Sequence, residues 1–276
     1  MKKGIFLIML FLGTTIYAQN FQGKATYKTF RKVDFKMGEE KGTPKSDMQK
    51  KIQEQLRKQF QQTYTLNFNK SESTYTQNKK LSTPQARSGG FSMIIAGSGS
   101  GADVLYKNIA TKKYVNKTEI SGKRFLIKDK LEYFGWKMSG ETKNIGNYTC
   151  YKATKSKEEE RTSFSMTDGR QEENKEKVII ETVAWYTPQV PISNGPEGYW
   201  GLPGLILEIQ EGKQTIVCSE IVLNTSGKIK EPLKGKKVTQ EKFDEIMSEH
   251  SKEMIERFKS KRKNKDGNSF SIQIQG

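Results

Sequence analysis

Apolar and polar residues alternate along most of the chain, which is the pattern of half-buried β-strands. The alternation begins in "FQGKATYKTF" at residues 21–30, resumes in "TYTLNFN" and "ESTYTQ", and continues after Asp103 as short runs separated by turn residues. Two further strand-like runs, "KVIIETVAWYTP" and "QTIVCSEIVLN", follow. The expected fold class is therefore mainly β (α+β). The alternation predicts a curved antiparallel sheet, of which a half-open barrel is one form.

Two segments depart from this alternation and predict helices. An amphipathic helix near the N-terminus is indicated by apolar residues four positions apart, with Ser46 or Asp47 placed to cap it: Met48, Ile52, Leu56 and Phe60. A basic C-terminal helix at 239–261 is indicated by Thr239 as its cap and by helical spacing of Phe243, Ile246, Met247, His250, Met254, Ile255 and Phe258. The sequence thus predicts two helices in an otherwise strand-rich chain.

The first residues predict export. Lys2 and Lys3 precede an apolar run at 5–12, and Ala18 is the small residue that signal peptidase needs. We expect a signal peptide at 1–18, then a single β-rich domain at 19–276 located in the periplasm or secreted. No cysteine lies near Ala18, so we expect no lipid anchor. No later segment has the roughly 20 apolar residues that a spanning helix requires.

A Gly/Ser-rich stretch at 84–103 surrounds the apolar island Phe91–Ala96. Such flanks are typical of flexible segments. The stretch is either a mobile flap over a cavity or an insertion whose island docks on the surface.

The segment "YWGLPGLILEI" concentrates apolar and stiff residues in an otherwise polar chain. Pro203 and Gly204 suit the second and third positions of a type II turn, which predicts a positive φ at Gly204. Leu205 to Ile209 then reads as a strand, which a hairpin at Glu211-Gly212-Lys213 joins to the following run.

The formal net charge of +17 includes the two lysines of the signal peptide. Such an excess suggests acidic partners, or simply a lysine-rich soluble surface. The basic residues are scattered rather than interleaved with aromatic ones, and the chain is exported, so we expect no nucleic-acid partner.

Two cysteines remain after the signal, Cys150 and Cys218, and both lie in strand-like runs. Export to an oxidising compartment makes a cross-strand disulfide one expectation. Two buried thiols too far apart to bond are the other.

The pattern of reactive residues predicts no catalytic or metal site. His250 is the one histidine, and it lies on the apolar stripe of the C-terminal helix without clustered ligands. No nucleophile elbow, phosphate loop or dinucleotide fingerprint is present. Glu208 alternates within an apolar strand, so it faces either solvent or a cavity. We expect a protein that is not an enzyme and has no cofactor.

The segment "AWYTPQVPISNGPEGYWGLPGLILEI" resembles the signature of the GLPGLI family, whose six residues stand here at Gly201, Leu202, Pro203, Gly204, Leu205 and Ile206. Trp136-Lys137 and Cys150-Tyr151-Lys152-Ala153 are similar to upstream features of that family. The resemblance implies an exported protein of Bacteroidota and carries no particular activity. The strand order also resembles the half-open barrel of periplasmic lipoprotein carriers, which is an analogy of fold alone.

Two functions fit these observations. The first is a periplasmic binding or carrier module that holds an apolar or lipid-like ligand in a groove of the sheet. The residues expected to line it are Trp185, Tyr186, Tyr199, Trp200, Leu202, Leu205 and Leu207. Core packing around the turn is the alternative explanation for these residues. The second function is an interaction protein of the outer-membrane system, which would use the GLPGLI loop and the basic surface to hold a protein partner.

Overall fold

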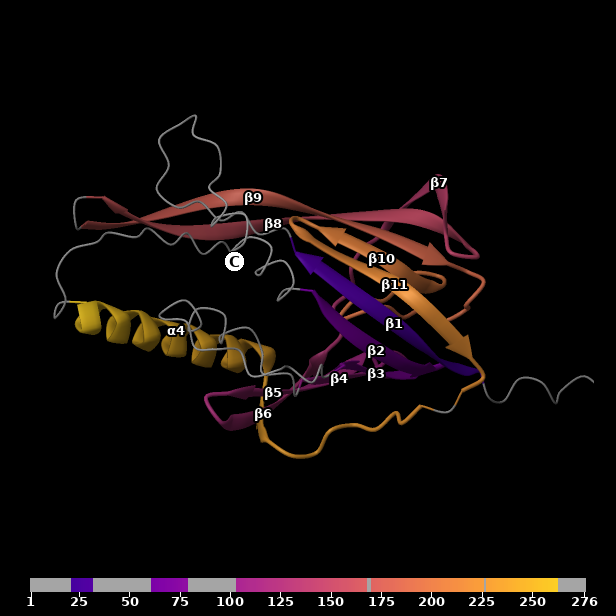
Figure 1. The fold of residues 1–276 in the computed structure, drawn as a ribbon, viewed down its shortest axis with the longest axis horizontal. Coiled ribbons are helices and arrows are strands. Elements are labelled where there is room, and N and C mark those ends of the chain that lie inside the picture. The colour runs from indigo at the N-terminus through magenta and orange to yellow at the C-terminus, as the bar shows by residue number, and fades with distance from the viewer. Residues whose placement is uncertain (1–20, 32–60, 79–102, 168–169, 226, 263–276) are drawn as a thin grey trace, which may run out of the picture.

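The structure is a computed structural model that describes residues 21–31, 61–78, 103–167, 170–225 and 227–262. Within these residues twelve strands form one sheet in the order β12-β6-β5-β4-β3-β2-β1-β11-β10-β9-β8-β7 (Figure 1). The strands are β1 (Gln22–Arg31), β2 (Gln62–Asn69), β3 (Glu72–Gln77), β4 (Val104–Asn108), β5 (Lys113–Ile120), β6 (Lys123–Lys130), β7 (Lys137–Ile145), β8 (Tyr148–Thr167), β9 (Arg170–Thr187), β10 (Leu205–Glu211), β11 (Gln214–Leu223) and β12 (Lys236–Val238). The mainly β prediction is confirmed.

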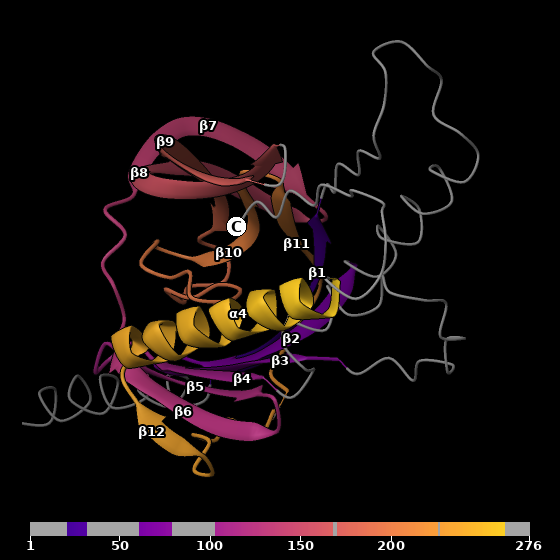
Figure 2. The same ribbon diagram turned by 90° about the vertical axis from the view of Figure 1, so that its left-hand side faces the viewer.

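The sheet is curled but not closed, because β12 and β7 remain as its two edges. Neighbouring strands are antiparallel, except that β12 runs parallel to β6. Figure 2 shows the sheet passing from β7–β9 above, through β11 and β1, to β4–β6 below. The chain between β9 and β10 lies in the middle of this curve. The concave side is therefore occupied by the protein's own chain.

The strand β1 illustrates how alternation builds the core. Ala25 and Tyr27 are fully buried, while Thr26 between them is half-buried. Successive side chains of a strand point to opposite faces, so one face of β1 enters the core. The Tyr27 hydroxyl donates a hydrogen bond of 2.7 Å to the Ile206 carbonyl, which ties β1 to β10 across the curve.

The C-terminal helix is confirmed as α4 (Gln240–Arg262). Its predicted cap is confirmed too, because the Thr239 hydroxyl accepts a hydrogen bond from the Lys242 amide at 3.2 Å. Asp129 of β6 accepts a second one from the Gln240 amide at 3.1 Å. The backbone amides of Lys130 and Gln240 both donate to the Asp129 carboxyl and lower its pKa. Phe243 packs edge-on against Phe125, which fixes the start of α4 on β6.

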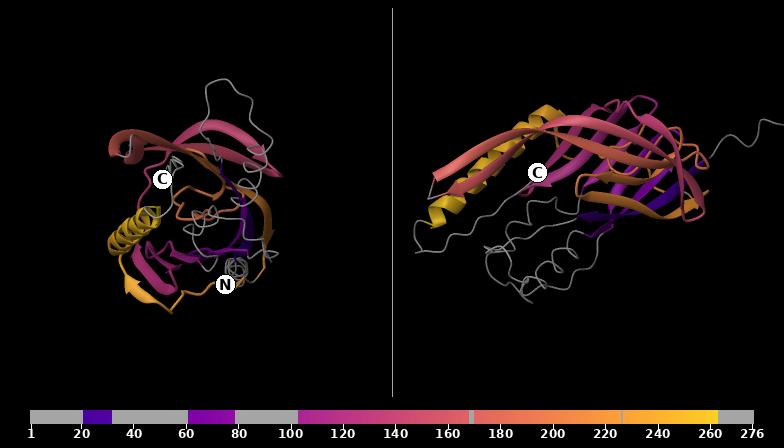
Figure 3. Two further views of the ribbon diagram at one scale, coloured as in Figure 1. Left: turned by 60° about the vertical axis from the view of Figure 1, so that its left-hand side comes forward. Right: turned by 90° about the horizontal axis from the view of Figure 1, so that it is seen from above.

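The strands β8 and β9 form a long ribbon beyond the rest of the sheet. β9 pairs with β10 only from Thr182 to Thr187, whereas β8 and β9 continue to pair with each other as far as Thr167 and Arg170. Figure 3 shows this ribbon and α4 extending from the same end of the sheet. The predicted hairpin of β10 and β11 is confirmed in the sheet itself.

Three predicted features lie outside the described residues: the signal peptide at 1–18, the helix near the N-terminus, and all of the Gly/Ser-rich stretch except Asp103. Among the helices that the structure describes, none combines the length and apolar character needed to cross a bilayer.

Candidate functional site

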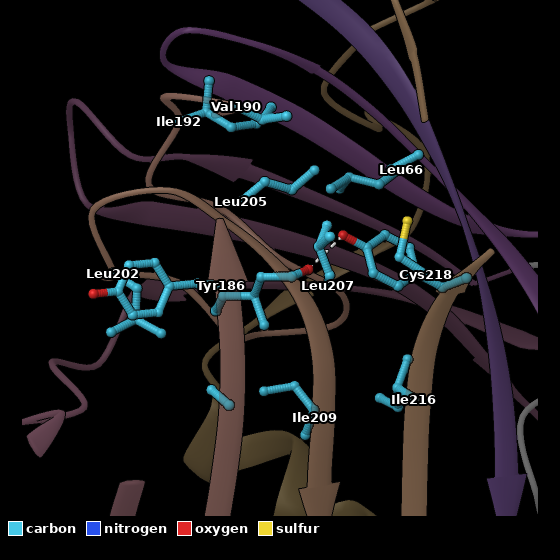
Figure 4. Packing of buried hydrophobic residues seen from close by; sticks show 14 of the residues in the cluster. Leu66, Tyr186, Val190, Ile192, Leu202, Leu205, Leu207, Ile209, Ile216 and Cys218 are labelled. Carbon is cyan, nitrogen blue, oxygen red and sulfur yellow. Dashed lines mark hydrogen bonds between the residues drawn. The ribbon is translucent and has the colours of Figure 1, made fainter. Parts of the chain in front are cut away.

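The chain at 188–204, here called the inserted loop, fills the concave side of the sheet. Its backbone is held by hydrogen bonds to the start of β10. The Leu205 amide donates to the Val190 backbone carbonyl at 3.0 Å, and the Ile206 amide donates to the Asn194 backbone carbonyl at 2.9 Å. Val190 and Ile192 then pack against the core, as Figure 4 shows. The inserted loop is therefore part of the core rather than a cover above it.

Most residues that were expected to line an apolar groove lie in this core. Tyr186, Trp200, Leu202, Leu205 and Leu207 are between 0% and 7% exposed. Figure 4 shows Tyr186, Leu202, Leu205 and Leu207 packed within the core. Their apolar surfaces contact other core residues, as the packing alternative expects, and not an open groove. Trp185 alternates with buried neighbours and thus points to the other face of β9, where the Lys143 ammonium lies 4.4 Å from its ring centre. Of the seven expected residues, Tyr199 alone lines the cavity described below.

The turn before β10 differs from the predicted type II turn. The Gly204 amide donates to the Leu202 carbonyl at 2.8 Å, which makes a three-residue γ-turn centred on Pro203. The positive φ belongs to Gly201, at 95°, and not to Gly204. Gly204 is required for another reason, because a Cβ there would lie 2.5 Å from the Thr187 carbonyl carbon. The glycine allows β10 to approach the end of β9.

An aromatic cluster joins the inserted loop to the segment before β7. The Trp136 indole donates to the Trp200 carbonyl, and the Trp200 indole donates to the Glu132 carbonyl, both at 2.8 Å. Phe134 lies 5.4 Å from Trp136 and 5.6 Å from Tyr199 between ring centres. These contacts fix Phe134 and Tyr199 as one aromatic wall.

A cavity of about 270 Å³ lies between this wall and strands β8–β10. It is lined by Glu132, Phe134, Lys155, Lys157, Glu159, Ile180, Thr182, Glu197, Gly198, Tyr199 and Glu211. The Lys155 ammonium lies 4.3 Å from the Phe134 ring centre, inside the distance of a favourable cation–π contact. The cavity thus combines an aromatic surface with charged groups of both signs.

The carboxylates of the cavity are held by neighbouring donors. Glu211 accepts hydrogen bonds from the Thr182 and Tyr199 hydroxyls. Glu197 accepts one from the Gln214 amide at 3.1 Å. Burial raises the pKa of Glu197, and the charge of Glu211 raises it further. Burial and the Glu211 carboxylate also raise the pKa of Tyr199. These carboxylates are thus fixed in position rather than free in solvent.

Glu197 has a φ of 46°, in the left-handed region that residues other than glycine seldom adopt. Such strain persists only where the surroundings impose it, and it is common at binding sites. Here the strained backbone lets one short segment, Glu197 to Tyr199, supply three cavity residues.

Behind Glu197 a buried lysine fixes the inserted loop. Lys107 of β4 is 0% exposed, and its ammonium donates to the Gly195 carbonyl at 2.8 Å and to the Tyr199 carbonyl at 3.1 Å. Burial lowers the pKa of Lys107 to about 7, and the Glu197 carboxylate partly opposes this shift. Lys107 therefore positions the backbone on both sides of Glu197.

The other candidate residues lie away from the cavity. Glu208 is buried, forms an ion pair of 2.7 Å with Lys143 and is not among the residues that line the cavity. The imidazole of His250 on α4 is hydrogen-bonded to the Ser121 hydroxyl at 2.8 Å. Among the described residues, no group of three or more His, Cys, Asp or Glu side chains is placed to hold a metal ion.

Cys150 and Cys218 are buried free thiols on β8 and β11. The strands β9 and β10 lie between them, so the predicted link across neighbouring strands is not formed. Burial raises the pKa of Cys150 to about 11 and that of Cys218 to about 12.

These raised values predict slow reaction with Ellman's reagent. The thiolate is the reacting form, so at about pH 8 the folded protein should react slowly. In denaturant the pKa of both thiols returns toward about 8.5, and two thiols per chain should then react. A denatured, unreduced protein that shows no reactive thiol would instead establish a disulfide.

Sequence reasoning missed Lys107, Phe134, Lys155 and Glu197. A signal existed for Lys107, because strand alternation in "VLYKN" places it on the same face as Leu105, which packs against the core. Lys155 was visible only as part of a charged run. Glu197 has no local signal, since its burial depends on how the inserted loop folds back.

A sequence model of the family described as "Protein of unknown function (Porph_ging)" matches residues 136–208, which include β7 to β9, the inserted loop and the cavity residues Lys155 and Tyr199. No curated protein matches the chain significantly.

Two solved structures match part of this chain: "Structure of PNGF-II in C2 space group" and "Structure of PNGF-II in P21 space group". Each has a TM-score of 0.48 and 11% identity over 82% of this chain. The chain spans only 32% and 33% of the length of those proteins.

Proposed function

We propose that the protein is an exported binding module, not an enzyme, and that its ligand site is the cavity between the inserted loop and strands β8–β10. The observation that carries this proposal is the pairing of a fixed aromatic wall with fixed carboxylates in one cavity. Concave sites with apolar walls and few oriented polar groups are typical of ligand binding. The resemblance to the GLPGLI family supports export.

The lining favours a small amphipathic amine. Phe134, Ile180 and Tyr199 offer apolar surface, whereas carboxylates outnumber lysines four to two among the lining residues. The ammonium of Lys155 on Phe134 shows that this aromatic face accepts a cation. A volume of about 270 Å³ is close to the lower limit of roughly 300 Å³ for ligand pockets. The expected class of lipid-like ligands is therefore narrowed to small molecules with a short apolar part and a cationic head.

Binding fits the charged groups better than catalysis does. Glu211 is engaged by Thr182 and Tyr199, Glu197 by Gln214, and Glu159 by Lys157 at 3.4 Å. A general acid or base needs a proton path to a reacting group. Carboxylates held in this way serve instead as oriented acceptors for a ligand.

The test is calorimetric titration with two probes that share a ring and differ in charge, tryptamine and indole-3-propionate. Tryptamine should bind more tightly, by roughly tenfold or more, since its amine meets carboxylates while the carboxylate of the other probe meets like charge. Phe134→Ala should weaken tryptamine binding by roughly tenfold because the ring contact is lost.

Tyr133→Ala is the matched control. Tyr133 is the neighbour of Phe134 but is 85% exposed and does not line the cavity, so its loss should leave the affinity unchanged. Equal binding of the two probes, or an unchanged affinity in Phe134→Ala, would refute the proposed site.

The alternative function is that of an interaction protein of the outer-membrane system. The observation that favours it is the ribbon of β8 and β9, because two-stranded ribbons are only marginally stable without a partner. The GLPGLI residues would contribute little to such a contact, since Leu202, Leu205 and Ile206 are buried. Failure of both probes to bind would favour this role over ligand binding.

A further inference from the structure

The outer face of β5 and β6 is crossed by the segment 227–235, here called the strap. Ile229 of the strap packs on the buried cluster of Tyr106, Val115 and Leu126. The Thr74 hydroxyl donates to the Lys228 carbonyl at 3.1 Å, which fixes the start of the strap. Further along, Glu231 forms an ion pair of 2.6 Å with Lys128. The strap thus lies on the face of β6 opposite α4, and it leads into β12.

This face carries positive charge that its own acids do not neutralise. The register of β5 and β6 places Lys113 directly opposite Lys130, an arrangement of like charges that costs stability. The strap and β12 add the exposed lysines Lys230, Lys234 and Lys237. The acids of β5 and the strap on this face, Glu119 and Glu231, are already paired with Arg124 and Lys128.

An apolar side chain stands among these lysines. Leu233 is 77% exposed and lies between Pro232 and Lys234. Ile229, four residues earlier in the strap, is half-buried against the sheet, whereas Leu233 is presented to solvent. Lysines around an exposed leucine form a surface with both a charged and an apolar component.

We propose that this face, formed by the strap, β12 and the adjoining lysines of β5 and β6, docks on an anionic lipid bilayer. The lysines would lie at the headgroup phosphates, and Leu233 would enter the interface between headgroups and acyl chains. Lysine ammonium groups act as point charges that suit a diffuse anionic layer, whereas specific bidentate recognition favours arginine. The exposed leucine favours lipid over a soluble polyanion, which offers no apolar phase. The inference is independent of the cavity, which lies on the concave side.

The test is co-sedimentation of the full chain with vesicles of phosphatidylcholine, with and without phosphatidylglycerol. Binding should require phosphatidylglycerol and should weaken as salt is added. The triple change Lys230→Glu, Lys234→Glu and Lys237→Glu should weaken it by well over tenfold, since each surface lysine contributes about a fivefold factor. Leu233→Ser should weaken it by roughly tenfold.

The matched control variant replaces three exposed lysines elsewhere with glutamate: Lys28, Lys137 and Lys177. Its change in net charge equals that of the triple variant. This control should retain most of the binding. Equal binding to neutral vesicles, an equal loss in the control, or a Leu233→Ser variant that binds like the parent would each overturn the proposal. Retention on heparin without sedimentation on any vesicle would overturn it in favour of a soluble polyanion.

Discussion

Gly204→Val is expected to prevent the protein from folding stably. A Cβ at this position would lie 2.5 Å from the Thr187 carbonyl carbon, 2.8 Å from the Pro188 nitrogen and closer still to the Thr187 oxygen. These are backbone atoms at the end of β9, so no side-chain movement relieves the overlap. The start of β10 must separate from β9, and the Tyr27 hydrogen bond to Ile206 is lost with it. We expect a loss of more than about 4 kcal/mol in the free energy of unfolding.

The measurement is denaturant unfolding followed by tryptophan fluorescence. Gly140→Val on β7 is the matched control, because a Cβ there has nothing within 4 Å and its φ is not positive. The control should unfold like the parent. A Gly204→Val protein that unfolds within about 1 kcal/mol of the parent would show that β9 and β10 do not depend on this close approach.

Lys107→Met is expected to destabilise the fold by roughly 2–6 kcal/mol. The variant leaves the Gly195 and Tyr199 carbonyls without their donor, and each buried carbonyl left unpaired costs about 1–3 kcal/mol. The inserted loop should then lose its fixed position around Glu197. Thermal or chemical unfolding measures the stability, and tryptamine titration should show weaker binding in any folded fraction.

The dependence on pH follows from the lowered pKa of Lys107. Below about pH 7 the amine is protonated in both the folded and the unfolded chain, so it contributes no slope. Between about 7 and its ordinary value of 10.5, the unfolded chain binds a proton that the folded chain lacks. Over this window the parent should gain stability relative to Lys107→Met as pH rises. A difference that stays constant or shrinks would show that Lys107 is not buried as described.

Features set by neighbouring residues were predictable from the sequence. Thr239 caps α4 because its hydroxyl reaches an amide three residues on, and the hairpin at Glu211-Gly212-Lys213 joins two runs of clear alternation. The turn at Pro203 was predicted in place but not in type. Its geometry depends on how β10 approaches Thr187, which lies on another strand.

The candidate site was less predictable because long-range contacts create it. Lys107 and Gly195 are 88 residues apart in sequence, and their hydrogen bond decides where the inserted loop lies. That placement turns Trp200, Leu202 and Leu205 into core residues, whereas the local pattern is equally typical of a groove. The same placement brings Glu197 and Tyr199 together with residues of β8–β10 around the cavity.

The central claim is that the ligand site is the cavity and not the apolar segment before β10. Titration of ¹⁵N-labelled protein with tryptamine tests it most directly, because amide shifts locate binding residue by residue. We expect saturable shifts at the amides of Ile180, Thr182, Gly198 and Tyr199, which line the cavity. Shifts centred on Leu202, Leu205 and Leu207, with these four amides unmoved, would place the ligand in the apolar groove and not in the cavity.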